Sequence, residues 1–465
     1  MNPALDLLRA FPIRPGETVA LTGAGGKTGL LFALAKAYGG PTLLTTTTHL
    51  GVWQAPLAEQ HLSLAPGEDL VEKIPESFGT LLVTGPAGAD KRLAAPTPGQ
   101  LEALREYAAQ KRIPLLIEAD GARQKTLKAP AEHEPAVPAW VDRVIVVAGL
   151  SALGRPLDEA TVHRPERFAA LSGLRLGDAI TADSLVTVLR HPQGGLQGLP
   201  AGAERVLFLN QAETPDLQAQ ANRIAGKVQE AYHRVVIGSL RQQAPNAQVA
   251  SVHSQVAGVI LAAGGSQRLG RPKQLLDWQG QTFIAQVVQN ALEAGLAPLV
   301  VVTGAESEAV GAAIAGLPVT VVHNPDWQAG QSTSMKAGLA ALPAACQAVM
   351  FLMSDQPHCS PLLIRSVMAS YFTQRLPIAA PRIAGRRANP VLFDRETFEA
   401  LRTVEGDQGG RAVFNQFQPA WLDWVDERNA LDVDDEADYA RLQRAYFPDP
   451  DRGTGFHDFL SDSAD

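Results

Sequence analysis

Cysteine is scarce in this sequence: only Cys346 and Cys359 occur among 465 residues. Their spacing fits no zinc-binding pattern, and two cysteines cannot build the disulfide framework on which small secreted domains depend. We therefore expect a protein of a reducing compartment, the cytoplasm.

A net positive charge and long apolar runs are lacking as well. The formal net charge is −8, whereas a general nucleic-acid binder needs a basic face to displace the counterions of the phosphate backbone. No apolar run reaches the length of a membrane-spanning helix. The first residues, MNPALDLLRAFPIRPGE, lack the basic segment and apolar core of a secretory signal. We expect neither a nucleic-acid partner nor a membrane partner.

What is present predicts a globular chain of two α/β domains. Hydrophobic residues make up 46% of the sequence and charged residues 19%, an ordinary balance for buried cores. Residues 1–240 and 256–448 each alternate short apolar runs with segments of helical period, as buried strands with crossover helices require. The polar segment 241–255 is predicted to be a linker, although its pattern also permits a strand near Val249–Val252. Residues 449–465 are predicted to form a poorly ordered tail.

The clearest functional signal is the segment Val259–Lys273, VILAAGGSQRLGRPK. An apolar strand runs into Gly264 and Gly265, where the missing side chains let the backbone approach a triphosphate. Arg268 and Lys273 would offset the charge of the phosphates and of a departing pyrophosphate. A tight turn is the alternative, but two basic residues at this spacing favour a nucleotide site.

Acidic residues later in the same series suggest a metal site. Asp355 directly follows the apolar run Val349–Met353, at the strand end where an open α/β sheet binds its ligands. Carboxylate oxygens are preferred ligands of the Mg²⁺ that accompanies a triphosphate. The segment ALDVDDEADY offers Asp432 or Asp434 as a second ligand, although acids are also favourable at a helix N-terminus. An acidic turn before Pro357 is the alternative explanation for Asp355.

The first series opens with a shortened phosphate-binding loop. An apolar strand runs into TGAGGKT, and an apolar helix follows. In such loops backbone N–H groups surround phosphates, a lysine contacts the terminal phosphates and a hydroxyl binds Mg²⁺. The loop is short because Leu21 stands where the usual pattern has its first glycine. We predict that a nucleotide, ATP or GTP, is bound by Gly23, Gly25, Gly26, Lys27 and Thr28.

Polar residues follow other strands of this series. The apolar run Leu115–Ile117 leads into Glu118, Ala119, Asp120 and Gly121, where a carboxylate would bind Mg²⁺. We assign this role to Asp120, together with Thr28. The run TTTTH at 45–49 offers hydroxyls and an imidazole, although threonines also favour strands by shape alone. The segment NQAE at 210–213 resembles a base-reading motif distantly, and a polar turn explains it better.

Six motifs of the second series resemble those of MobA-like nucleotidyltransferases, and most of all the molybdenum cofactor cytidylyltransferase branch. They occur in the family's order over about residues 256–442: LAAGGSQRLGRPK, HNPDWQAGQSTSMKAGL, MSDQP, RANPVLF, EGDQGGR and LDVDDEADY. The resemblance implies a Rossmann-like domain with a mixed sheet. It also implies an enzyme that joins CTP to the phosphate of Mo-molybdopterin and releases pyrophosphate, with Mg²⁺ as cofactor.

The same resemblance assigns roles to residues. Arg268, Lys273 and Asp355 would be catalytic, and Asp432 or Asp434 would complete the metal site with Asp355. The nucleotide would be bordered by Leu261, Ala262, Ala263, Gly264, Gly265, Asn324, Trp327, Gly330, Ser332 and Ser334. The pterin side would be bordered by Arg387, Asn389, Pro390, Gly406, Asp407, Gly409 and Gly410. Two positions depart from the family pattern: Leu269 replaces methionine, and Asp435 replaces a frequent threonine.

Motifs of the first series are similar to those of the selenium-dependent hydroxylase accessory protein family. They are TGAGGKT, TTTTH, EADGARQKTLKAP, HEPAVP and VHRPERF, over about residues 5–240. The resemblance implies a P-loop-like parallel-sheet domain that serves the maturation of molybdenum hydroxylases, one of which would receive the cofactor. Fusion of the two domains would raise the local concentration of their sites.

Two other functions are compatible with parts of the sequence. A sugar-phosphate or alditol-phosphate nucleotidyltransferase would use the same loop and acids, but RANPVLF and EGDQGGR favour the pterin substrate. A non-catalytic carrier or chaperone for a molybdenum hydroxylase is disfavoured in the second series by Lys273 and Asp355. It stays open for the first series, where the phosphate-binding loop is incomplete.

Overall fold

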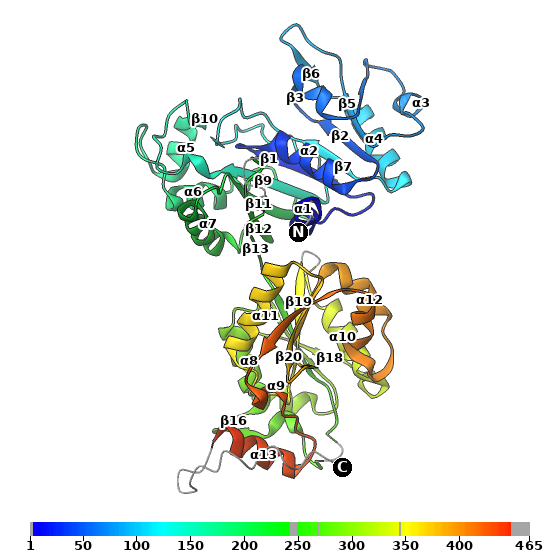
Figure 1. Ribbon diagram of the computed structural model, residues 1–465, viewed down its shortest axis with the longest axis vertical. Coiled ribbons are helices and arrows are strands. Elements are labelled where there is room, and N and C mark those ends of the chain that lie inside the picture. Colours follow the sequence, from blue (N-terminus) through cyan, green and yellow to red (C-terminus); the bar gives the residue numbers. More distant parts are fainter. Residues whose placement is uncertain (1–2, 242–248, 267–268, 344–345, 448–465) are drawn as a thin grey trace. The chain divides into compact units, whose positions relative to one another are not determined.

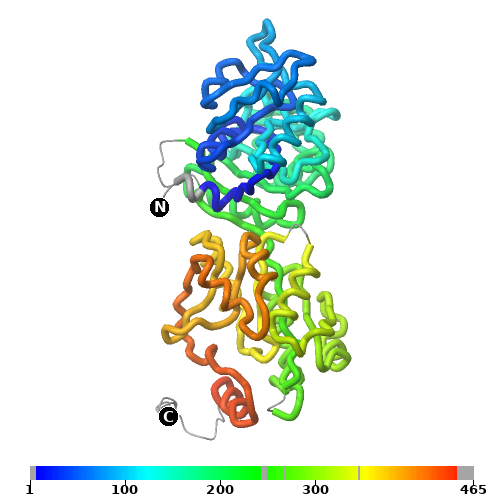
Figure 2. Tube along the Cα trace, turned by 90° about the vertical axis from the view of Figure 1, so that its right-hand side faces the viewer, coloured from blue at the N-terminus to red at the C-terminus, as the bar shows by residue number. Residues whose placement is uncertain are grey.

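The computed structural model describes residues 3–241, 249–266, 269–343 and 346–447 (Figure 1). The chain divides into two compact units, Met1–Gln255 and Val256–Asp465. Each has its own hydrophobic cores, and Figure 2 follows the chain through each of them by colour. The predicted tail, 449–465, lies outside the described residues.

The first unit is built on a nine-stranded sheet in the order β13-β12-β11-β9-β1-β7-β2-β5-β4. Neighbouring strands run parallel except at the β12–β13 edge. The strands are β1 (Thr18–Gly23), β2 (Thr42–Thr46), β4 (Gln60–Ser63), β5 (Thr80–Thr84), β7 (Leu115–Glu118), β9 (Arg143–Gly149), β11 (Glu204–Asn210), β12 (Arg234–Ile237) and β13 (Ser251–Ser254). Two small two-stranded sheets add β3 (His49–Gly51) with β6 (Arg92–Ala94), and β8 (Leu127–Lys128) with β10 (Val162–His163).

Helices cover both faces of this sheet, which is why its central strands are apolar on both sides. In β1, Val19 and Leu21 belong to one core, which includes residues of α1 and α2, while Ala20 belongs to another, which includes residues of α4, α6 and α7. The helices are α1 (Pro3–Ala10), α2 (Lys27–Tyr38), α3 (Leu70–Lys73), α4 (Pro98–Lys111), α5 (Pro165–Ser172), α6 (Ala182–Arg190) and α7 (Pro215–Val228).

The predicted linker is wrong in its last part. Residues Ser251–Ser254 form β13, which pairs antiparallel with β12 so that Val252 lies opposite Val236. Val252 is buried, and this apolar contact places the segment in the first sheet. The strand that the sequence permitted near Val249–Val252 therefore exists, shifted by two residues.

The second unit has a mixed sheet in the order β18-β17-β14-β19-β22-β20-β21, with β23 beside β20. Strands β18, β17, β14 and β19 run parallel, whereas β22 is antiparallel to both β19 and β20. The strands are β14 (Ala257–Ala262), β17 (Leu299–Thr303), β18 (Thr320–His323), β19 (Ala348–Met353), β20 (Ile378–Ile383), β21 (Arg386–Arg387), β22 (Val391–Asp394) and β23 (Pro419–Trp424). The expected mixed sheet is thus observed.

Helices lie on both faces of this sheet too (Figure 1). Residues of α8 and α11 belong to one core, and residues of α10 and α12 to the other. The helices are α8 (Phe283–Glu293), α9 (Ser307–Ala313), α10 (Gln331–Ala340), α11 (Pro361–Gln374), α12 (Phe398–Thr403) and α13 (Glu436–Tyr446).

An aromatic cluster fixes the C-terminal helix α13 beside the hairpin of β15 (Asp277–Trp278) and β16 (Gln281–Thr282). The ring of Trp278 lies 5.5 Å from that of Tyr446 and 5.9 Å from that of Phe283. Tyr439 packs against Phe283 and donates a hydrogen bond to the Asp277 carbonyl. This packing returns the acidic segment 432–438 to the glycine-rich loop after β14.

Candidate active site

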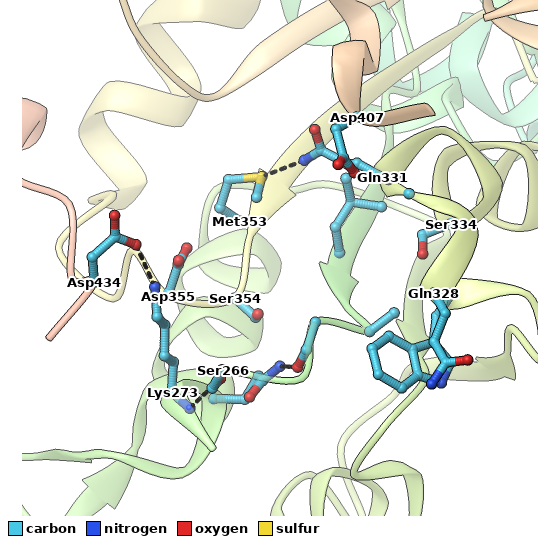
Figure 3. A pocket seen from close by; sticks show the side chains of 16 residues that line it. Ser266, Lys273, Gln328, Gln331, Ser334, Met353, Ser354, Asp355, Asp407 and Asp434 are labelled. Atoms are coloured by element: carbon cyan, nitrogen blue, oxygen red, sulfur yellow. Dashed lines mark hydrogen bonds and ion pairs between the residues drawn. The ribbon is translucent and has the colours of Figure 1, made fainter. Parts of the chain in front are cut away.

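A cavity of about 770 Å³ lies at the carboxyl ends of β14 and β19 in the second unit (Figure 3). Because these strands are parallel neighbours, the loop after β14 and the residues after β19 meet at one edge of the sheet. The cavity is lined by Leu261, Ala263, Gly264, Ser266, Lys273, Gln274, Trp327, Gln328, Gly330, Gln331, Ser334, Met353, Ser354, Asp355, Asp407 and Asp434.

A buried glutamine holds the glycine-rich loop in shape. The Gln274 side chain is 3% exposed, and its amide donates to the carbonyls of Ala262, at 3.3 Å, and Gly264, at 2.8 Å. The Ser266 hydroxyl accepts a hydrogen bond from the Lys273 N–H. The loop therefore closes on itself around the first turn after the strand.

Lys273 points across the cavity toward the acidic segment 432–438 (Figure 3). Its Nζ lies 2.7 Å from Asp434 Oδ1. This contact joins the loop to a segment 161 residues further along the chain. Arg268, the other predicted cation of the loop, lies outside the described residues.

Asp355 lies in an environment that disfavours its charge. Burial raises the pKa of its carboxyl to about 6; Lys273 opposes this rise, while Asp432 and Asp434 add to it. Asp432 is positioned by Gln356, the residue after Asp355, whose amide donates to Asp432 Oδ1 at 2.9 Å. Within the described residues, no group of three or more His, Cys, Asp or Glu side chains is arranged to hold a metal ion.

The N-terminus of α10 forms another wall of the cavity. Its N-cap, Gly330, has a φ of 111°, and a Cβ there would lie 2.6 Å from the backbone of Gly406. Asp407 accepts a hydrogen bond from the Gln331 N–H at 3.1 Å, so a carboxylate from a distant segment caps the helix. Asn324 donates to the hydroxyls of Thr333 and Ser334 and fixes the first turn from the other side.

The structure brings many, but not all, of the predicted residues to this cavity. Those that line it are Leu261, Ala263, Gly264, Lys273, Trp327, Gly330, Ser334, Asp355, Asp407 and Asp434. Those that do not line it are Ala262, Gly265, Asn324, Ser332, Arg387, Asn389, Pro390, Gly406, Gly409, Gly410 and Asp432. Of these, Arg387 instead lies over the ring of Phe414 at 4.8 Å.

Six lining residues were not assigned a role by the sequence reasoning: Ser266, Gln274, Gln328, Gln331, Met353 and Ser354. They are uncharged, and no spacing rule distinguishes them from ordinary surface residues. Five of the six are next to a predicted site residue in the sequence, such as Gln274 after Lys273 and Ser354 before Asp355, and Met353 is one residue further away. This proximity is the only signal that could have found them.

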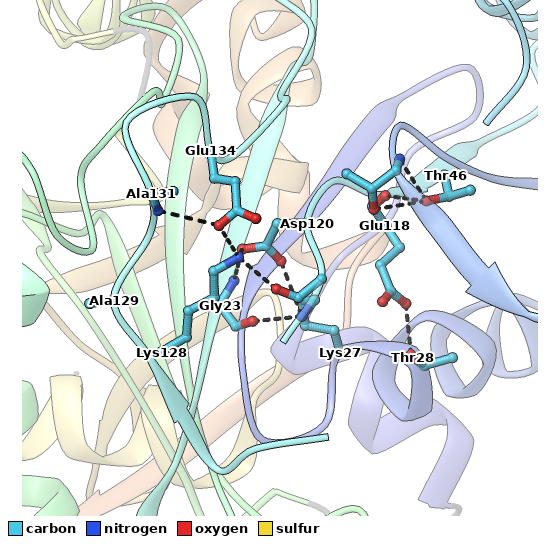
Figure 4. Close-up of polar contacts among 12 residues, drawn as sticks. Gly23, Lys27, Thr28, Thr46, Glu118, Asp120, Lys128, Ala129, Ala131 and Glu134 are labelled. Carbon is cyan, nitrogen blue, oxygen red and sulfur yellow. Dashed lines mark hydrogen bonds and ion pairs between the residues drawn. The ribbon is translucent and has the colours of Figure 1, made fainter. Parts of the chain in front are cut away.

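The loop of the first unit holds its lysine among carboxylates (Figure 4). Lys27 Nζ lies 3.1 Å from Asp120 and donates to the Gly23 carbonyl at 2.6 Å. Asp120 also accepts from the Gly23 N–H and pairs with Lys128 at 2.8 Å. Asp120 is 2% exposed, and its two lysine partners offset the cost of its buried charge.

The predicted metal ligands Thr28 and Asp120 do not contact each other in the structure. The Thr28 hydroxyl donates to Glu118 Oε2 at 2.7 Å. Asp120 instead forms ion pairs with Lys27 and Lys128. Burial raises the pKa of Glu118, and Lys27 and the Thr28 hydroxyl oppose the rise. Glu118 is the last residue of β7, and Asp120 lies two residues further on in the turn; the spacing of these carboxylates alone does not decide which one contacts Thr28.

Comparisons with known proteins assign a family to each unit. The family model described as YqeC protein matches residues 19–166, and the model described as MobA-like NTP transferase domain matches residues 258–420. YqeC of Escherichia coli is 33% identical over 232 residues, which cover 48% of this chain and 88% of the relative. The chain belongs to both families. Its second unit is a nucleotidyltransferase domain.

Two further relatives match the second unit. Nicotine blue oxidoreductase of Paenarthrobacter nicotinovorans is 36% identical over 199 residues, covering 40% of this chain and 96% of the relative. Molybdenum cofactor cytidylyltransferase of Escherichia coli is 34% identical over 85 residues, covering 18% of this chain and 44% of the relative. No helix within the described part of the chain is long and apolar enough to cross a membrane.

Proposed function

We propose that the second unit is a Mg²⁺-dependent cytidylyltransferase that transfers CMP from CTP to the phosphate of Mo-molybdopterin. One observation carries the proposal: Lys273 and Asp355 line a single cavity with the glycine-rich loop and the N-terminus of α10. Such an arrangement offers backbone N–H groups, a cation and a carboxylate to a triphosphate.

The chemistry requires no nucleophile from the protein. A phosphate oxygen of the pterin attacks the α-phosphorus of CTP, a new P–O bond forms, and the bond to the β-phosphate oxygen breaks. Pyrophosphate leaves with the electron pair of that bond. The protein aligns the two phosphates and offsets the charge of the leaving group, for which Lys273 is the available cation.

The acidic residues fit a hard divalent cation. Asp355 is raised in pKa partly by Asp432 and Asp434, and a bound cation would relieve that repulsion between like charges. Asp434 is paired with Lys273, whereas Asp432 accepts a hydrogen bond from Gln356, the residue after Asp355. We therefore assign Mg²⁺ to Asp355 and Asp432. The ion would neutralise charge on the triphosphate.

The choice of substrate is supported by the motifs RANPVLF and EGDQGGR and by the relative named molybdenum cofactor cytidylyltransferase. The product would pass to a molybdenum hydroxylase, with the first unit as an accessory domain, in the cytoplasm. A relative of nearly full coverage is named an oxidoreductase, which makes electron transfer the competing function.

Pyrophosphate release separates these two functions. The full chain is incubated with Mo-molybdopterin, Mg²⁺ and each of the four NTPs, with Asp355→Asn as the matched control. We expect pyrophosphate with CTP and almost none with the variant. Oxidation of an added nicotinamide coenzyme coupled to reduction of an added electron acceptor, without pyrophosphate from any NTP, would establish the competing function instead.

A further inference from the structure

The first unit contains a cavity of about 700 Å³ around the N-terminus of α2. It is lined by the loop after β1, by the two-stranded sheet of β3 and β6 (the β3–β6 ribbon) and by residues 121–126. Asn210 and Gln211, at the end of β11, line it as well. This cavity is independent of the site in the second unit, and the cytidylyl transfer proposed above makes no use of it.

The charges around this cavity suit a polyanion. One acidic side chain, that of Glu118, occurs among the described residues that line it. Five basic side chains share the same lining: Lys27, Arg92, Arg123, Lys125 and Arg241. An excess of cations in a concave site concentrates anionic ligands there.

Four backbone N–H groups at the start of α2 are available to such an anion. Gly26 is the N-cap and provides no side-chain hydrogen bond. The first helical hydrogen bond is donated by Leu30 to the Gly26 carbonyl, and no acceptor within the described residues pairs with the N–H groups of residues 26–29. Gly25 lets the loop lie close to its neighbours, because a Cβ there would be 2.6 Å from the Gly149 N and the Thr126 carbonyl.

Glu118 and Thr28 offer oxygen ligands beside these N–H groups (Figure 4). The Glu118 side chain is 7% exposed, and its Oε2 accepts the Thr28 hydroxyl. No partner of its Oε1 is found in the described part of the chain, and Glu118 is among the residues that line the cavity. A carboxylate beside a hydroxyl offers the oxygen ligands that Mg²⁺ prefers.

Trp53 provides an aromatic surface at the ribbon side of the cavity. Its side chain is 62% exposed, although large aromatic side chains are usually buried. The ring packs over Gly51, where a Cβ would lie 2.5 Å from ring atoms, so the glycine leaves room for the ring. Exposed aromatic rings are surfaces on which nucleic-acid bases stack.

We propose that this cavity binds a Mg²⁺–nucleoside triphosphate, with the phosphates on the N–H groups of residues 26–29, Mg²⁺ on Thr28 and Glu118, and the base on Trp53. When the nucleotide binds, the Lys27 ammonium leaves the Gly23 carbonyl and Asp120 and contacts the phosphates instead. Lys128 stays with Asp120 and keeps that buried carboxylate paired. The metal ligand is therefore Glu118, and Asp120 is a positioning residue for Lys27.

Photolabelling of the full chain tests this site separately from that of the second unit. The probes are the 8-azido derivatives of ATP and GTP with Mg²⁺, and labelled peptides are located by mass spectrometry. We expect label on peptides of the β3–β6 ribbon, competed by unmodified Mg²⁺–ATP or Mg²⁺–GTP. Label confined to peptides of the second unit would overturn the proposal.

Variants test the assigned residues. Thr28→Ala and the isosteric Glu118→Gln should each weaken competition at the first unit at least tenfold, while Lys36→Ala, an exposed residue on the same helix, should leave it unchanged. Equal competition in all three proteins would overturn the metal assignment. Circular dichroism confirms that each variant is folded.

Tripolyphosphate with Mg²⁺ tests the role of Trp53. We expect Trp53→Ala to weaken competition by the nucleotide at least fivefold and to leave competition by tripolyphosphate unchanged, while Trp53→Phe keeps the stacking face and most of the affinity. Tripolyphosphate that competes as well as the nucleotide in the unmodified chain would overturn the base-binding role.

Discussion

Lys273 Nζ and Asp434 Oδ1 lie 2.7 Å apart and join the glycine-rich loop to the segment that precedes α13. The lysine side chain is 15% exposed and the aspartate side chain 54% exposed. An ion pair with one well-solvated partner contributes little to stability, so a triphosphate can replace Asp434 as the partner of Lys273 at small cost. Under the proposed function, Asp434 would be the counter-ion of Lys273 before CTP binds, and Asp432 would hold the metal ion.

Removing the charge of Asp434 should therefore affect binding more than chemistry. We expect Asp434→Asn to lower the KM for CTP about two- to fivefold with little change in kcat, because Lys273 no longer leaves a carboxylate when it binds phosphate. Steady-state kinetics at fixed Mg²⁺ measures both constants. In contrast, Asp432→Asn should lower kcat at least a hundredfold. The opposite pattern in the two variants would assign the metal to Asp434.

The Asp355 carboxylate should be required for activity and should lower the stability of the metal-free protein. Asp355→Asn should abolish pyrophosphate release and, without Mg²⁺, raise the Tm of the second unit at pH 8. Since the folded pKa is raised from 3.8 to about 6, ionisation costs stability progressively between these two values and fully above pH 6. Replacing the carboxylate should raise Tm by on the order of 5 °C.

The difference in Tm between Asp355→Asn and the unmodified protein should vanish below about pH 4, where the carboxyl is protonated in both folded and unfolded states. Calorimetric scans in EDTA from pH 4 to 8 measure it. A variant that is folded and still turns over CTP at the normal rate would contradict the metal assignment; a Tm difference independent of pH would contradict the cost of ionisation.

Gln274 should act on substrate binding through the shape of the loop. Gln274→Leu removes both hydrogen bonds to the loop carbonyls, each contributing about 1 kcal/mol, while nearly preserving side-chain volume. We expect the KM for CTP to rise roughly tenfold. Gln374→Leu, on the exposed side of α11, is the matched control. An unchanged KM in Gln274→Leu would mean that the loop keeps its shape without the glutamine.

Base choice should depend in part on Ala263. Its side chain is 6% exposed and borders both the cavity and Gly304, where a Cβ would lie 2.8 Å from the Ala263 methyl. The methyl narrows the site and so favours the smaller pyrimidine base. We expect kcat/KM for CTP to exceed that for GTP roughly ten- to two-hundredfold, and Ala263→Gly to reduce this preference. An unchanged ratio would place selectivity elsewhere, near Trp327.

Local sequence pattern accounts for the elements and for much of the site. The apolar runs Leu115–Ile117 and Val349–Met353 lie within β7 and β19, because a strand buried on both faces has continuous apolar residues in its sequence. The loop glycines, Lys273 and Asp355 were predictable since their chemistry depends on residues close in sequence.

Contacts between distant segments were not predictable in this way. Nothing local distinguishes Glu118 from Asp120 as the partner of Thr28, because the choice depends on how β7 is placed beside the start of α2. The same holds for Asp407, which caps α10 from a segment 76 residues away, and for β13, whose pairing with β12 made part of the predicted linker a strand.

Transfer of label from [α-³²P]CTP to Mo-molybdopterin tests the function of the second unit most directly. The full chain is incubated with both substrates and Mg²⁺, the product is isolated, and its mass is measured by mass spectrometry. We predict a product heavier than the pterin by one CMP unit, formed in equal amount to the pyrophosphate released, and none with Asp355→Asn. Label that stays in CTP while GTP supplies the nucleotide, or no transfer from any NTP, would contradict cytidylyl transfer.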